Sequence, residues 1–285
     1  MFKNILFVLS LFVLIGCDSS EITTTEPIIP PPQNADKLII NQENSDIVIA
    51  SIISSIGILR DRIENIPRID LDKISGLDSS ELLGDLDLGL DISDIVDICE
   101  DGGKAILNSA SSTSVNITFK ECKDDGKVIN GNSNLELNDG EYHLELNQFR
   151  YDNNSFFEYA DITYDERGDR KDIIAFISSG FIINNGEQIS LRNILFKKIA
   201  QNYILNGDLG TGCLGGVIIV KTIEAISAPD NKCPNGGELY AVGGDGSTLG
   251  IIFNKDVSIE TFLNNGIKEY YDTCLDLPTY SDVCS

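Results

Sequence analysis

Short runs of alternating apolar and polar residues, separated by tight-turn signals, recur along this chain from Ser114 onward. In the first run Val115, Ile117 and Phe119 alternate with polar neighbours, and Asp125-Gly126 follows as a turn. Period-two alternation is typical of a strand with one buried face, and Asp-Gly or Asn-Gly pairs are typical of hairpins. Further runs cover 141–146, 156–164, 172–183, 188–196, 203–209, 217–226, 238–242, 249–253 and 257–263, with turn signals at 130–131, 243–246 and 265–266. The sequence therefore predicts a mainly β fold, an antiparallel meander from about residue 114 to residue 263.

Two of these runs are apolar on both faces. Residues 173–177 read Ile-Ile-Ala-Phe-Ile, and residues 217–220 read Val-Ile-Ile-Val. A strand with one covered face would alternate, so we expect part of the sheet to be buried on both sides. Either a helix covers the second face, or the sheet curls onto itself into a barrel-like form.

Residues 44–59 are the best candidate for one N-terminal covering helix. Their apolar residues recur at helical spacing and form a broad stripe. Asn44 or Ser45 could cap the helix, and Gly57 weakens its end. A helix lying on a membrane surface would carry Lys or Arg on its polar face, and none occurs before residue 60. We therefore expect this helix to pack against the protein core.

A short apolar stretch, residues 5–15, follows Lys3 and leads to Cys17. It is too short for a membrane-spanning helix, which needs ~20 apolar residues, and its layout is that of an export signal. The run Leu14-Ile15-Gly16-Cys17 resembles the lipobox of bacterial lipoproteins. The resemblance implies that the Cys17 thiol receives a diacylglyceryl group, with palmitate among the expected acyl chains, and that Cys17 begins the mature protein. Asp18 resembles the inner-membrane retention signal of enteric bacteria, but other bacteria sort differently, so inner or outer membrane stays open.

Residues 18–37 are rich in Ser, Thr and Pro, a composition that forms a semi-rigid spacer rather than a core. The full chain carries a net charge of −24, and removal of the signal with Lys3 gives −24 − 1 = −25. Such a surface repels nucleic-acid phosphates, so we expect no nucleic-acid partner. The charge itself favours solubility.

The segment 69–99 interleaves Leu and Ile with acidic residues. Calcium takes several carboxylate oxygens, so the segment could hold this ion. It lacks the D-x-[DN]-x-[DN]-G-x5-E loop, however, and we favour an acidic connector with short helical turns. The aspartates concerned are Asp70, Asp72, Asp78, Asp85, Asp87, Asp91, Asp94 and Asp97.

Six cysteines follow Cys17. An even number of Cys in an exported chain indicates disulfides, and nearness in sequence favours local pairs. A zinc site is the competing interpretation, but no C-x-x-C pair exists and the chain has one His. We therefore expect no metal and no cofactor. The expected disulfides are Cys99–Cys122, Cys213–Cys233 and Cys274–Cys284.

His143, the sole imidazole, shares a strand face with Glu141 and Glu145. A lone His with two flexible carboxylates matches few metal or acid–base sites, so we interpret it as a solvent-facing residue on a polar sheet face. A Ser-His-Asp triad would need this same His, and neither a G-x-S-x-G elbow nor a G-x-x-x-x-G-K-[ST] loop is present. We therefore assign no catalytic residue.

The sequence divides into a signal peptide (1–16), a lipid anchor and Pro/Thr-rich tether (17–37), a helix plus acidic connector (38–98) and an antiparallel β domain (99–285). We expect a lipid-anchored protein of the cell envelope that contacts the membrane through its anchor. Its body is interpreted as a non-catalytic binding or structural module with an unknown ligand or protein partner. The alternative is a carboxylate-based hydrolase such as a glycosidase, because that reaction needs only two suitably spaced acids.

Overall fold

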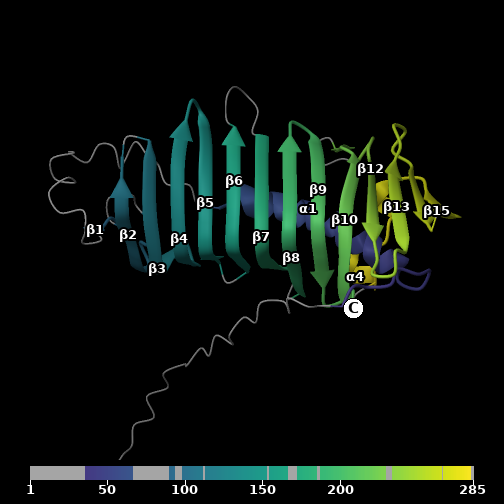
Figure 1. Cartoon of the computed structure of the whole chain (residues 1–285), viewed down its shortest axis with the longest axis horizontal. Helices are drawn as coiled ribbons and strands as arrows, with labels where there is room; N and C mark the ends of the chain where they lie inside the picture. The colour runs from purple at the N-terminus through teal and green to yellow at the C-terminus, as the bar shows by residue number, and fades with distance from the viewer. Residues whose placement is uncertain are drawn as a thin grey trace, which may run out of the picture.

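In the described part of the chain, fifteen strands form one antiparallel sheet. Nearly every strand pairs with its neighbours in sequence (Figure 1). The computed structural model describes residues 36–66, 90–93, 98–111, 113–152, 154–165, 172–184, 187–228, 233–264 and 266–283. The strands are β1 (Leu90–Asp91), β2 (Gly102–Ala110), β3 (Ser114–Asp124), β4 (Lys127–Asn138), β5 (Glu141–Tyr151), β6 (Ser155–Asp165), β7 (Asp172–Asn184), β8 (Glu187–Ile199), β9 (Asn202–Thr211), β10 (Gly216–Glu224), β11 (Ile226–Ser227), β12 (Glu238–Val242), β13 (Thr248–Phe253), β14 (Ile259–Leu263) and β15 (Gly266–Tyr271). Tight turns such as Asp125-Gly126 and Asp139-Gly140 have positive φ at both residues, the geometry that hairpins favour.

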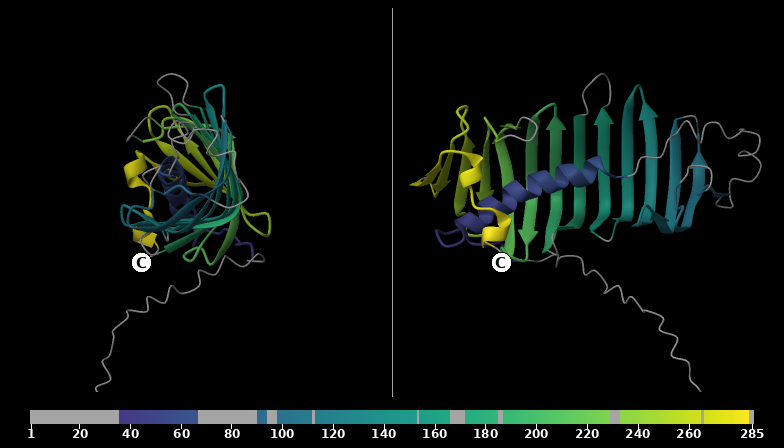
Figure 2. Two further views of the ribbon diagram at one scale, coloured as in Figure 1. Left: turned by 90° about the vertical axis from the view of Figure 1, so that its left-hand side faces the viewer. Right: turned by 180° about the vertical axis from the view of Figure 1, so that it is seen from behind.

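The predicted mainly β meander is confirmed, and the sheet is curled rather than closed (Figure 2). β1 and β15 lie at opposite edges, and among the described strands they do not pair with each other. The sheet is longer than the predicted range of 114–263, because β1 and β2 precede that range and β15 follows it. β1 also lies within the segment assigned to the acidic connector, most of which is outside the described residues.

Helix α1 (Ser45–Glu64) crosses the concave face of the sheet at a steep angle to the strands (Figure 2). Five of its buried residues join the same apolar cluster as the inward side chains of the sheet, namely Val48, Ile49, Ile52, Leu59 and Ile63. Ser45, Ala50, Ser51 and Ser55 are also buried. The predicted covering helix is therefore confirmed, with the core packing that its broad apolar stripe indicated. The expectation that the run 173–177 is buried on both faces is wrong, because α1 covers only the concave face and Ile174 and Phe176 are each 41% exposed. No helix in the described part of the chain has the length and apolarity that a membrane crossing needs.

The last turn of α1 is fixed to two strands of the sheet. The buried Tyr164 hydroxyl on β6 donates a 2.8 Å hydrogen bond to the carbonyl oxygen of Ile63, and Lys198 on β8 forms an ion pair with Glu64. These contacts stabilise the last turn of α1, which ends at Glu64 and not at residue 59 as the sequence pattern predicted. Gly57 does not end the helix, and a Cβ atom there would have no neighbour within 4 Å.

The start of α1 differs from the prediction. Asn44 occupies the N-cap position, but its side chain caps no backbone N–H of the helix. Instead its Nδ2 donates to the carbonyl oxygen of Ile39 at 2.9 Å, and its Oδ1 accepts from the backbone N–H of Asn41 at 2.9 Å. Ser45 donates to the carbonyl oxygen of Gln42. Both side chains therefore fasten the incoming chain rather than the first turn of the helix.

Two Asn-Gly pairs inside strands help to bend the sheet. Gly131 in β4 has φ +112°, and a Cβ atom there would lie 2.3 Å from the carbonyl oxygen of Gln148 on β5. Gly207 in β9 repeats the arrangement, with φ +134° and 2.4 Å to the carbonyl oxygen of Asn193 on β8. Gln148 and Asn193 have positive φ and sit where the strand register shifts. Such bulges bend a strand and increase its twist, so they account for part of the curl.

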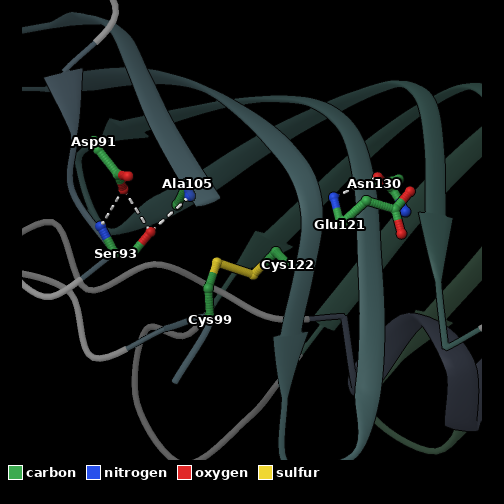
Figure 3. Close-up of a disulfide and its surroundings, with 7 residues drawn as sticks. All are labelled: Asp91, Ser93, Cys99, Ala105, Glu121, Cys122 and Asn130. Atoms are coloured by element: carbon green, nitrogen blue, oxygen red, sulfur yellow. Dashed lines mark hydrogen bonds between the residues drawn. A yellow bond between two sulfur atoms is a disulfide. The ribbon is translucent and has the colours of Figure 1, made fainter. Parts of the chain in front are cut away.

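The Asn of each pair supports a neighbouring strand on the other side. Asn130 Oδ1 accepts from the backbone N–H of Glu121 at 2.7 Å (Figure 3), and Asn206 Oδ1 accepts from the backbone N–H of Thr222 at 2.7 Å. The prediction of a hairpin turn at 130–131 is therefore wrong, because that pair lies inside β4. The Asn-Gly dipeptide, which often forms hairpin turns, lies here beside a β-bulge of the neighbouring strand.

The loop 243–247 forms the predicted turn between β12 and β13, and it also holds the incoming N-terminal segment. The backbone N–H of Gly244 donates to the carbonyl oxygen of Leu38 at 2.9 Å, and the backbone N–H of Ile40 donates to Ser247 Oγ at 2.8 Å. Gly243 permits this close approach, because a Cβ atom there would lie 2.6 Å from the carbonyl oxygen of Leu38. Residue 37, assigned to the tether, pairs with β10 and already belongs to the folded body.

Candidate functional site

Outward side chains of β5 and β6 form a polar cluster on the sheet face opposite α1. His143 Nδ1 lies 3.4 Å from Asp161 Oδ1, and its Nε2 lies 3.9 Å from Glu145 Oε1. The burial pattern of β5 places His143 on the polar face, as predicted. Its acidic and hydroxyl neighbours on β6, Asp161 and Thr163, come from a different strand and were not anticipated. Among the described residues, no group of three or more His, Cys, Asp or Glu is arranged to hold a metal ion.

The substitution His143→Ala should change the free energy of unfolding by less than about 1 kcal/mol, because its contacts with Asp161 and Glu145 are long and solvent-accessible, and such surface contacts typically contribute about 0–1 kcal/mol. Urea denaturation of the two proteins in parallel measures this difference. A loss of several kcal/mol would contradict the interpretation of His143 as a solvent-facing residue and would revive the metal or acid–base interpretation.

Four neighbouring strands, β5 to β8, each break their alternation at the same level of the sheet. In each strand two consecutive side chains are solvent-accessible between two buried residues, as in β5 between Leu146 and Phe149. Backbone register aligns the pairs, since Asn147 opposes Tyr159, Tyr159 opposes Ser179, and Ser179 opposes Arg192. We call these residues the transverse row: Asn147, Gln148, Glu158, Tyr159, Ser178, Ser179, Arg192 and Asn193.

The transverse row lines a shallow hollow with a volume of about 570 Å³. All eight of its residues line the hollow, and among the described residues no aliphatic side chain does. The bulges that break the alternation also aim these side chains to the same side, a use of bulges that is common beside functional sites. The row is therefore a continuous polar surface that runs across the strands.

The charges in and beside the transverse row are mostly paired or negative. Arg192 donates from Nε and Nη2 to Asp208 Oδ2 on β9, at 2.9 and 2.6 Å. The Tyr159 hydroxyl donates to Glu145 Oε1 at 3.4 Å. Burial, and then the nearby charges of Glu145 and Asp161, raise the pKa of Tyr159, so its phenol stays protonated at neutral pH. The hollow thus offers hydrogen-bonding groups with little positive charge.

A second hollow, with a volume of about 370 Å³, lies beside the last turns of α1. Its cations are engaged within the protein, since Arg62 lies 3.8 Å from Asp152 and the Lys127 Nζ atom sits 5.8 Å from the centre of the Tyr151 ring. These contacts fit a role in holding α1 against the β5–β6 turn, and this hollow is the weaker candidate.

The disulfide Cys99–Cys122 was correctly predicted (Figure 3). It joins the segment before β2 to β3, and both cysteines are buried. Beside it the Ser93 hydroxyl donates to Asp91 Oδ1 at 2.7 Å and accepts from the backbone N–H of Ala105 at 2.8 Å. Asp91, the one described aspartate among the calcium candidates, therefore has an intramolecular partner.

The other two expected pairs are wrong, because Cys233 bonds to Cys274 across 41 residues. This bond connects the segment before β12 to the segment after β15. Nearness in sequence failed here because the antiparallel β12–β15 unit brings its two ends together in space.

We expect the remaining disulfide to be Cys213–Cys284. Cys213 is disulfide-bonded, and its Sγ lies 3.8 Å from the carbonyl oxygen of Val283, the residue before Cys284. Cys284 itself lies outside the described residues, as does the lipidation candidate Cys17. Peptide mapping without reduction should recover a Cys213–Cys284 peptide, whereas a Cys213 peptide that alkylates without reduction would contradict this pairing.

The chain matches no protein-family model, and neither curated proteins nor solved structures show significant similarity to it. The candidate site therefore rests on geometry alone. Sequence reasoning missed the transverse row, although a signal for it exists. In each of the four strands two adjacent polar or amphipathic residues follow an apolar one, as in Leu146-Asn147-Gln148-Phe149 and Leu191-Arg192-Asn193-Ile194, which shifts the period-two pattern by one position.

Proposed function

We propose that this protein is a lipid-anchored protein of the cell envelope whose folded body is a non-catalytic binding module. The location is supported by the lipobox-like run that ends at Cys17 and by the disulfides, which form and persist in oxidising compartments. The Pro-rich segment would hold the body away from the membrane. The body would be attached to this tether at the loop 243–247.

The binding role is supported by one observation, the alignment of the transverse row across four strands. Broken alternation alone does not indicate a site, because bulges also bend the sheet and β3 has two consecutive exposed residues, Lys120 and Glu121, between buried ones. In β5 to β8, however, the accessible pairs are all polar or amphipathic, and together they line one hollow. The shared position favours selection for a common surface.

Mass spectrometry of the mature N-terminal peptide tests the anchor. We expect an acylated Cys17, and we expect Cys17→Ala to release the protein from the membrane fraction, whereas Ser19→Ala, just outside the lipobox, should leave it there. An unmodified Cys17, or membrane retention of Cys17→Ala, would refute the proposed attachment.

One observation favours the alternative of a carboxylate-based hydrolase. Glu145 and Asp161 oppose each other directly on β5 and β6, and glycoside hydrolysis needs two acids flanking the scissile bond. Neither acid lines the hollow, however, where Glu158 supplies the carboxylate found among the described lining residues. Release of reducing ends from an oligosaccharide by the wild-type protein, with loss of that release in Glu145→Gln, would favour the hydrolase over the binding module.

A further inference from the structure

We propose that the transverse row binds a neutral glycan, an extended chain of uncharged sugar units lying across β5 to β8. This inference rests on the proposed binding function and specifies its ligand. It is drawn from the donor and acceptor groups of the row, their spacing, the aromatic side chains beside them and the local charge.

The row offers hydrogen-bonding groups that both donate and accept. Asn147, Gln148 and Asn193 carry side-chain amides. Within the described part of the chain, no hydrogen bond joins these three side-chain amides to other residues. Ser179 adds a hydroxyl. Sugar hydroxyls also donate and accept, so amides and hydroxyls can satisfy them in pairs. A ligand with acceptors alone would leave half of these groups unused.

The spacing of the row suits a chain of repeating units. Adjacent strands lie roughly 4.8 Å apart, so the four pairs span about 14 Å from β5 to β8. Register places one polar group at each step, through Asn147, Tyr159, Ser179 and Arg192. An extended oligosaccharide presents hydroxyls at a similar interval, so successive sugar units could each meet a different strand.

One aromatic side chain lines the hollow, and a second lies beside it on the same sheet face. Tyr159 stands within the row, and Phe176 lies on the same face of β7, two residues before Ser178, with 41% of its surface exposed. The C–H faces of sugar rings are apolar and pack on aromatic faces, which bring a large contact area. The combination of amides, hydroxyls and a flat ring matches an uncharged sugar better than a purely apolar ligand.

Local charge argues against an anionic ligand. The guanidinium of Arg192 is bound by Asp208, and Glu158 lies in the hollow itself. Glu145 and Asp161 stand close by, and the full chain carries a net charge of −24. Phosphates, sulfates and uronic acids would meet repulsion here, so neutral sugars are the consistent class.

The test is calorimetric titration of the full mature lipoprotein in detergent with neutral hexasaccharides of glucose, mannose and N-acetylglucosamine at millimolar concentration. The variant Asn147→Ala/Asn193→Gly removes two amides, and Gly tolerates the positive φ of residue 193. Asn138→Ala, exposed at the end of β4, is the matched control. A heparin hexasaccharide serves as the anionic probe.

We expect at least one neutral hexasaccharide to bind, with affinity reduced about tenfold or more in the double variant and unchanged in the control. Three results would each overturn the inference: no binding of any neutral probe, tighter binding of heparin, or equal loss in Asn138→Ala. Acylation of Cys17 is scored on the same sample. An acylated protein that binds no sugar therefore refutes this inference alone, whereas loss of acylation refutes the proposed location.

Discussion

The substitution Gly131→Ala should lower the free energy of unfolding by about 3 kcal/mol or more. Gly131 has φ +112°, and an added Cβ atom would lie 2.3 Å from the carbonyl oxygen of Gln148, so the methyl group meets rigid backbone. Gly207→Ala should have a similar effect, because its Cβ atom would lie 2.4 Å from the carbonyl oxygen of Asn193. Urea denaturation with intact disulfides, followed by circular dichroism, measures both.

Gly57→Ala is the matched control for these variants. Gly57 lies inside α1 with open space around its Cα atom, so Ala should raise the free energy of unfolding by up to about 1 kcal/mol through its higher helix propensity. If Gly131→Ala and Gly57→Ala changed the free energy of unfolding equally, the proposed steric conflict between residue 131 and the backbone of Gln148 would be contradicted.

The second large effect is expected at the contact between α1 and the sheet. Leu59→Ala should lower the free energy of unfolding by about 2–5 kcal/mol, because Leu59 is 1% exposed and a smaller side chain leaves a cavity. Removal of residues 36–66 should cause aggregation, since the inward apolar face of the sheet would become exposed. Thermal unfolding and light scattering measure the two effects.

Ser54→Ala, on a less buried side of α1, controls for the change in helix propensity and should have little effect. A chain beginning at residue 69 that stays soluble with the same thermal midpoint would contradict the covering role of α1.

Much of the sheet could be predicted from sequence, because period-two alternation indicates a strand with one buried face and one exposed face. The runs beginning at residues 115, 156 and 172 correspond to β3, β6 and β7. β2 was missed because it opens on Gly102-Gly103, and glycines carry no side chain that reveals a face. The helix was predictable because its apolar stripe is broad, but its end depended on Tyr164 and Lys198, which lie far away in sequence.

The errors share one physical cause. The conformation and the partners of a short segment depend on strands that are distant in sequence. Asn130-Gly131 has the composition of a hairpin turn, but β3 and β5 on either side convert it into a bulge. The Cys233–Cys274 disulfide likewise follows strand pairing rather than sequence distance. The transverse row is the third instance, since its four pairs become one surface only through register.

Hydroxyl-radical footprinting of two tyrosines on β6 tests the central claim most directly, namely that α1 covers one sheet face while the transverse row faces solvent. Tyr159 belongs to the accessible row, whereas Tyr164 is 2% exposed and bonded to α1. We predict rapid oxidation of Tyr159 and protection of Tyr164 in the wild-type protein, with protection of Tyr164 reduced in Leu59→Ala. Equal oxidation of the two tyrosines in the folded wild-type protein would contradict this account.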